Sequence, residues 1–193
     1  MEPAIWPTLA DAVRVLEARG IEFALIGGLA VSLRGQPRMT VDVDLVMLAD
    51  VDRALELVRD IGATPFEPLF PGVEEVVARS YILPLRHRTT GIRVDVAIGM
   101  SGFERQAVRR AAPVSIGAVR VPVVATEDLL VMKALAGRPQ DEEDIRGLIA
   151  AQRDAIDWPG CLDLARRLGA AVDVDVAGRL LAARGQATEG DPT

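Results

Sequence analysis

The first two thirds of the chain mix two periodicities, one typical of helices and one typical of strands. Apolar residues recur every three or four positions in four segments, which predicts helices at 9–19, 29–34, 51–61 and 102–110. Alternation at every second position, or a short apolar run, predicts strands at 21–26, 41–46, 81–85 and 92–98, with one or two more in 114–124. Thr8 is expected to cap the first helix, and residues 86–91 to form a hairpin-like turn. Residues 63–79 give an ambiguous pattern. The mixture predicts an α/β fold.

From Thr126 onward the pattern is helical. Thr126 precedes two acidic residues, which predicts a helix start capped by its hydroxyl. Further helices are expected from Asp141 to Ala151 and at about 158–168 and 173–184. We therefore expect an α/β core over 1–124, a helical region over 125–185 and a flexible polar tail over 186–193.

Composition narrows the class of protein. The net charge of −6 over 193 residues argues against a protein that binds long DNA through its phosphates. No apolar run is long enough for a membrane helix, and Glu2 stands where a signal peptide has basic residues, so we expect a soluble cytoplasmic protein without a membrane partner. A single cysteine, Cys161, excludes a disulfide within the chain, and with one histidine, His87, it disfavours a zinc site.

Asp42 and Asp44 are separated by one residue in the strand predicted at 41–46. Side chains two residues apart on a strand point to the same face, with Cα atoms about 6.6 Å apart. Val41, Val43 and Leu45 would then face the core. Carboxylates this close repel each other unless a cation lies between them, and Mg²⁺ prefers such oxygen ligands. Acids are also common on the solvent side of an amphipathic strand, so the pair alone does not establish a site.

Asp95 in the strand predicted at 92–98 strengthens the metal hypothesis. Val94, Val96 and Ile98 share one face, so Asp95 lies on the other with Arg93 and Ala97. If this strand lies beside 41–46, three carboxylates converge in an arrangement suited to two metal ions about 3.5–4 Å apart. Gly27-Gly28, between a strand and a helix, would let a phosphate approach the helix N-terminus, although a tight turn also explains the pair.

Three segments together resemble the nucleotidyltransferase superfamily of DNA polymerase β, and within it the small prokaryotic AbiEii-like toxins and related minimal nucleotidyltransferases. They are Ile26-Gly-Gly-Leu-Ala-Val31, Arg38-Met-Thr-Val-Asp-Val-Asp-Leu45 and Val94-Asp-Val96. The resemblance covers residues 21–99 and implies a small mixed or antiparallel sheet with flanking helices. It implies a nucleoside triphosphate donor, two Mg²⁺ ions (or Mn²⁺), and transfer of a nucleoside monophosphate with release of pyrophosphate.

The resemblance also implies roles for particular residues. Asp42, Asp44 and Asp95 would be the catalytic metal ligands, and Gly27 and Gly28 would embrace the triphosphate. Many family members have Gly-Ser at this turn. Gly28 replaces that serine here, and Ser32, one helical turn later, is a possible substitute.

The helical half resembles the AbiEii-like group through Lys133-Ala-Leu-Ala-Gly-Arg138 and Asp141-x-x-Asp144. Lys133 and Asp144 would contribute to the active cleft. Lys133 is the single lysine beside twenty-one arginines, and it shares a helix face with apolar residues. A snorkelling lysine, or an ion pair with Asp144, explains it equally well. Asp141 is expected to stabilise the start of its helix.

Two further basic residues are candidates for contacts with the substrates. Arg38, between the glycine turn and the aspartate pair, is a candidate phosphate contact. His87 is expected at the surface of the 86–91 turn, where it could touch the acceptor.

Three functions remain open from the sequence. The first is an active nucleotidyltransferase, such as the toxin of a toxin–antitoxin pair with a cognate antitoxin, whose acceptor would be RNA, a protein, a nucleotide or another small molecule. The second is an aminoglycoside-modifying nucleotidyltransferase, which needs an acidic pocket for a polycationic drug. The third is a non-catalytic nucleotide-binding module. Three mutually repelling carboxylates argue against the third.

Overall fold

The chain forms two compact units in the computed structural model, which describes residues 4–35, 37, 39–117 and 119–189. Met1–Leu29 and Met39–Val124 make the first unit, and Ala30–Arg38 and Ala125–Thr193 make the second. Among the described residues, the longest apolar helices fall short of what a membrane crossing requires.

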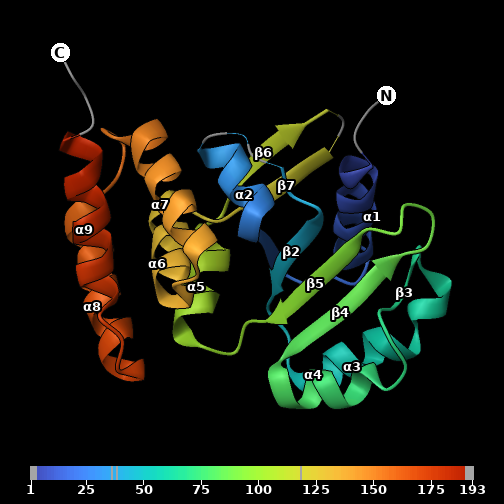
Figure 1. The fold of residues 1–193 in the computed structure, drawn as a ribbon. Coiled ribbons are helices and arrows are strands. Elements are labelled where there is room, and N and C mark those ends of the chain that lie inside the picture. The colour runs from blue at the N-terminus through green and yellow to red at the C-terminus, as the bar shows by residue number, and fades with distance from the viewer. Residues whose placement is uncertain (1–3, 36, 38, 118, 190–193) are drawn as a thin grey trace. The chain divides into compact units, whose positions relative to one another are not determined.

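The first unit is built on a mixed sheet (Figure 1). Its described strands are β1 (Phe23–Ile26), β2 (Asp42–Met47), β3 (Phe66–Pro68), β4 (Ile82–His87), β5 (Arg93–Ile98), β6 (Ala112–Ile116) and β7 (Val119–Val123). They lie in the order β3-β4-β5-β2-β1-β7-β6. β2 is parallel to β5 and β1 is parallel to β7, whereas the other neighbours are antiparallel. This confirms the expected α/β fold with a mixed sheet.

Period-two alternation decides which face of the sheet is the core. Leu45 of β2 and Val96 of β5 are buried on one face. They line the same small interior space as Leu16 of α1 (Ile5–Glu17) and Leu57 of α3 (Val51–Arg59). The helix α4 (Val73–Ser80) packs on α3 and β4, and α5 (Gly102–Arg110) packs on β1 and β2. A short 3₁₀ turn follows α3 at Ile61–Ala63.

Several local expectations in this unit were wrong. Thr8 does not cap α1, because the helix begins one turn earlier with Ala4 at the N-cap; the Thr8 hydroxyl donates to the Ala4 carbonyl at 3.0 Å. Residues 63–79 contain β3 and α4, elements too short for a clear periodicity. Val41 precedes β2 and is 76% exposed, so it does not join Val43 in the core.

The second unit is helical. Its elements are the Ala30–Arg34 part of α2 (Gly27–Arg34), α6 (Thr126–Ala136), α7 (Pro139–Gln152), α8 (Trp158–Val172) and α9 (Val176–Glu189). The Gln152 side chain donates to the Arg34 carbonyl at 2.6 Å, which ties α2 to α7. Thr126 is the first residue of α6 and Ala125 is the N-cap, so the expected cap by Thr126 is wrong. The helix α9 runs to Glu189, into the segment where a flexible tail was expected, and residues 190–193 lie outside the described residues.

We expect Cys161 to be unreactive in the folded protein. It is buried in α8, and burial raises the pKa of its thiol to about 12, helped by the negative charges of Glu127, Asp128 and Asp157. A disulfide reagent at pH 8 should react on the order of a hundredfold more slowly than with an unfolded thiol, because the thiolate is the reactive species. Absorbance of the released thiolate with and without denaturant measures this; rapid stoichiometric labelling of the native protein would contradict it.

Candidate functional site

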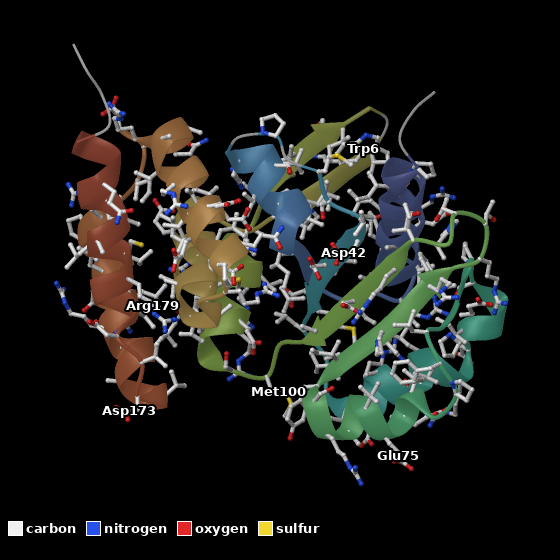
Figure 2. The ribbon with its side chains drawn as sticks, viewed as in Figure 1. Trp6, Asp42, Glu75, Met100, Asp173 and Arg179 are labelled. Carbon is white, nitrogen blue, oxygen red and sulfur yellow. The ribbon has the colours of Figure 1, made fainter. Side chains whose placement is uncertain are left out.

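The carboxylates Asp44 and Asp95 face each other across two neighbouring strands. β2 and β5 pair in parallel, with Asp44 opposite Asp95 and Asp42 opposite Arg93 (Asp42 is labelled in Figure 2). The expected adjacency of segments 41–46 and 92–98 is therefore confirmed. All three carboxylates are half-buried, on the face opposite to the buried Val43, Val94 and Val96.

Gly27 keeps the backbone close to this carboxylate group. It follows β1 and begins α2, and its φ of +68° is a conformation that favours glycine. A Cβ at this position would collide with the Asp44 carboxylate. The sequence therefore requires glycine here for two separate reasons, backbone angle and space. Gly28 is buried in the first turn of α2, and Ser32 is half-buried four residues further along the same helix.

Arg93 is the partner of Asp95 that sequence reasoning missed. Its guanidinium donates to both carboxylate oxygens, from Nε to Oδ1 at 2.8 Å and from Nη2 to Oδ2 at 2.8 Å. The pKa of Arg93 lies above its ordinary value because of this hydrogen bond, and the charges of Asp95, Asp42 and Asp44 add to the effect. The signal was available, because Arg93 and Asp95 lie two residues apart on one strand. Thr40 makes a further contact, donating to Asp42 Oδ1 at 3.1 Å.

The three carboxylates fit a hard divalent cation by their chemistry; Asp95 contacts Arg93, and Asp42 contacts Thr40. Within the described ranges, no three His, Cys, Asp or Glu side chains are already arranged around one metal position. The charges of all three acids raise the pKa of the neighbouring Arg93, so a positive charge beside them is electrostatically favoured. Glycine at position 27 also allows the Asp44 carboxylate to lie directly against the start of α2. The residues present therefore fit Mg²⁺, provided that Arg93 turns away from Asp95.

Lys133 and its acidic partners form a buried charge cluster in the second unit. Lys133 is 6% exposed, and its Nζ lies 3.0 Å from Asp141 Oδ1 and 2.8 Å from Asp144 Oδ2. The pair with Asp144 is one of the alternatives that the sequence left open. Asp141 also accepts from Arg138 Nε at 2.8 Å. Burial raises the pKa of Asp141, but the hydrogen bonds from Arg138 and Lys133 outweigh it, so that the pKa lies below its usual value.

The remaining candidate residues are His87 and Arg38. His87 ends β4 and is 3% exposed, so the expected surface position is wrong. Its Nε2 lies 3.0 Å from Asp11 Oδ2, and its Nδ1 accepts a hydrogen bond from the Thr90 backbone N–H. The imidazole ring therefore links α1 to the turn that follows β4. Polar partners on α1 stabilise it in the interior, which the local sequence did not reveal. Arg38 lies outside the described residues.

The chain matches a known protein family over most of its length. Residues 6–173 match the family described as nucleotidyl transferase of unknown function (DUF2204). None of the curated proteins matches the chain in sequence.

Solved nucleotidyltransferase structures share the fold at low identity. An antigenic nucleotidyltransferase-like protein from Paracoccidioides brasiliensis superposes with a TM-score of 0.54 at 20% identity, over 91% of each chain. The antibiotic-resistance factor ANT(2'')-Ia gives 0.52 at 14% identity, over 98% of this chain and 94% of that one. The lincosamide antibiotic adenylyltransferase LnuA gives 0.51 at 13% identity, over 77% of this chain and 96% of that one. With the family match over most of its length, the chain belongs to the nucleotidyl transferases of unknown function and is a nucleotidyltransferase.

Proposed function

We propose that the protein transfers a nucleoside monophosphate from a nucleoside triphosphate to an acceptor hydroxyl with the help of Mg²⁺. The observation that carries this proposal is the pairing of Asp44 with Asp95 across β2 and β5, with Asp42 on the same face. Gly27, the first residue of α2, adjoins the same carboxylates. A single face of the first unit thus combines acidic ligands with a glycine turn at a helix start, a combination suited to a metal-bound triphosphate.

The reaction forms one bond and breaks one. The acceptor oxygen bonds to the α-phosphorus of the triphosphate, the bond from that phosphorus to the bridging oxygen breaks, pyrophosphate leaves, and the hydroxyl proton goes to water. Bound Mg²⁺ would neutralise the triphosphate and lower the pKa of the attacking hydroxyl. Asp42 and Asp44 would hold the metal beneath the triphosphate, and Asp95 would serve the acceptor side.

The nucleotide contacts that we propose are Gly27, Gly28, Arg38 and Lys133. Gly27 and Gly28 would present backbone N–H groups to the phosphates, as helix starts do for anions. Lys133 would have to exchange one of its carboxylates for a phosphate, because its ammonium now lies between Asp141 and Asp144. Ser32 and Asp144 are secondary candidates.

A finer assignment concerns the biological role. We propose that the protein is an AbiEii-like toxin with a cognate antitoxin, supported by the order of Lys133, Arg138 and Asp144 after the three acids. The antibiotic-modifying enzymes ANT(2'')-Ia and LnuA share the fold, and their identities of 14% and 13% support nothing beyond the fold. Drug modification therefore remains the alternative, to be decided by the acceptor.

Calorimetric titration of each nucleoside triphosphate, with and without Mg²⁺, tests the proposal. We expect Mg²⁺-dependent binding to the wild type and its loss in the double variant Asp42→Ala/Asp44→Ala, because two of the three ligands are gone. The matched control is Glu74→Ala/Glu75→Ala, which removes the same charge from exposed positions on α4 and should bind like the wild type.

An α-labelled triphosphate added to a lysate then reveals the acceptor, since label should move to one class of molecule only with the intact acids. A folded wild-type protein that binds no triphosphate with Mg²⁺ would overturn the proposal and leave a non-catalytic module.

A further inference from the structure

Two arginines share the sheet face of the three carboxylates. Across the strands, Arg86 of β4 lies opposite Arg93 of β5, and Arg93 lies opposite Asp42 of β2. Because paired residues point to the same side of a sheet, both guanidinium groups lie on the carboxylate face. Both residues are exposed, whereas Leu85 and Val94, their neighbours along the chain, are buried in the core. The face therefore carries acids on β2 and β5, arginines on β5 and β4, and Glu67 on β3 opposite Arg86.

Arg86 differs from the nearby arginines in its partners. Arg93 pairs with Asp95, and Arg88 donates to Glu67 Oε2 at 3.2 Å. Glu67 lies opposite Arg86 in the pairing of β3 with β4, yet its carboxylate is engaged by Arg88. Within the part of the chain that the structure describes, the Arg86 guanidinium has no ion-pair partner, and it lies beside another arginine. Asp95 balances the charge of Arg93, so the Arg86 guanidinium is the group on this face that is suited to an anionic ligand.

The strand order indicates which of the two substrates would lie beside Arg86 and Arg93. The order β4-β5-β2-β1 places the glycine turn, which follows β1, on one side of the carboxylates and Arg86 on the other. Three strand spacings separate β1 from β4, about 14 Å in all. A triphosphate held at Gly27 lies at the first side. Arg86 and Arg93 therefore flank Asp95 on the side left for the acceptor.

We infer that the acceptor is a phosphate-bearing ribose hydroxyl, whose phosphate is bound by Arg86 and, once it leaves Asp95, by Arg93. This inference rests on the proposed function, and it specifies the acceptor of that same site. The planar guanidinium group of arginine binds phosphate oxygens in pairs, which would hold the hydroxyl beside Asp95. One or two phosphate contacts also agree with a net charge of −6, which disfavours binding along a polynucleotide.

Calorimetry with the donor site filled tests this inference. The protein is first saturated with α,β-methylene-ATP and Mg²⁺, and is then titrated with adenosine, AMP or the dinucleoside monophosphate ApA. The wild type should bind one of the phosphate-bearing probes at least tenfold more tightly than adenosine, and Arg86→Gln should weaken that binding about tenfold or more without changing adenosine binding. Preference for AMP indicates a mononucleotide acceptor, and preference for ApA indicates the 3′ end of an RNA.

Arg79→Gln is the matched control, because Arg79 is exposed on α4 and its loss changes the net charge equally. It should bind every probe like the wild type. The inference is overturned if Arg86→Gln binds AMP and ApA as the wild type does, or if tobramycin, a polycationic probe, binds more tightly than either. Saturation with the ATP analogue is measured in the same samples, so failure of that first step would count against the proposed function itself, and success there isolates the acceptor inference.

Discussion

Replacement of Lys133 with methionine is expected to lower the free energy of unfolding by about 3–5 kcal/mol. The ammonium is 6% exposed and lies within 3.0 Å of carboxylate oxygens of both Asp141 and Asp144. Methionine nearly matches the shape of the lysine stem, so packing changes little. Without the ammonium, the buried carboxylates of Asp141 and Asp144 lose their shared positive partner. The uncompensated cost of removing these charges from water is the main source of the lost stability.

Urea unfolding of the full chain followed by circular dichroism measures this effect. The matched control is Arg167→Met, which breaks an exposed pair with Asp163 within α8, at 3.0 Å and with both side chains about two-thirds exposed. Such a surface pair contributes about 0–1 kcal/mol. A triple variant, Lys133→Met with Asp141→Asn and Asp144→Asn, should recover much of the loss because this cluster then contains no buried charge. Equal stabilities of the Lys133 and Arg167 variants would show that the cluster does not support the fold.

The same variant separates two roles for Lys133. If it also contacts the triphosphate, folded Lys133→Met should bind Mg²⁺-ATP more weakly than the wild type. If the cluster is structural only, the affinity per folded molecule stays constant. Calorimetry at temperatures at which the variant is fully folded distinguishes the two roles, because the titration then reports nucleotide binding alone.

The grouping of the three aspartates on one sheet face could be predicted because its signal is periodic and local. Asp42, Asp44 and Asp95 alternate with buried apolar residues along their strands, so the alternation itself turns them to one face. Strand pairing depends on segments that are distant in sequence. The pairing of 41–46 with 92–98 was expected from the order of the motifs, not from any single residue. The structure confirms it with Asp44 opposite Asp95. The helix α5 at Gly102–Arg110 was also predicted with correct limits, whereas the helix expected at 9–19 is α1 at Ile5–Glu17.

What the sequence could not show depends on contacts between distant segments. His87 looks like a surface histidine between two arginines, and it is buried because Asp11, on a helix far away in sequence, accepts its hydrogen bond. Thr8 looks like a cap, but the helix begins at Ile5, and the Thr8 hydroxyl instead lies 2.7 Å from that of Thr90, which is distant in sequence. The partner of Asp95 was local but was overlooked, because Arg93 was considered only as an exposed neighbour.

Replacement of Gly27 with alanine is expected to abolish transfer while leaving a folded protein. Position 27 has φ +68°, which costs an alanine about 1–2 kcal/mol, and the new Cβ collides with the Asp44 carboxylate. Asp44 must then move away from Asp95 and from the metal that the three acids would hold. Since a metal ion contributes several kcal/mol to transition-state stabilisation, we expect the rate of label transfer from α-labelled ATP to fall at least about a hundredfold.

Gly20→Ala separates the collision from the backbone strain. Gly20 has a similar φ of +63°, but a Cβ there has no neighbour within 4 Å. Gly20→Ala should therefore lose about 1–2 kcal/mol of stability in urea unfolding from backbone strain alone, and Gly27→Ala should lose at least as much because the collision adds to the strain. Calorimetry should show weaker Mg²⁺-ATP binding in Gly27→Ala alone. If both variants retain full affinity and transfer, then the close contact between the glycine turn and Asp44 is not part of the nucleotide site, and the triphosphate must bind elsewhere on the carboxylate face.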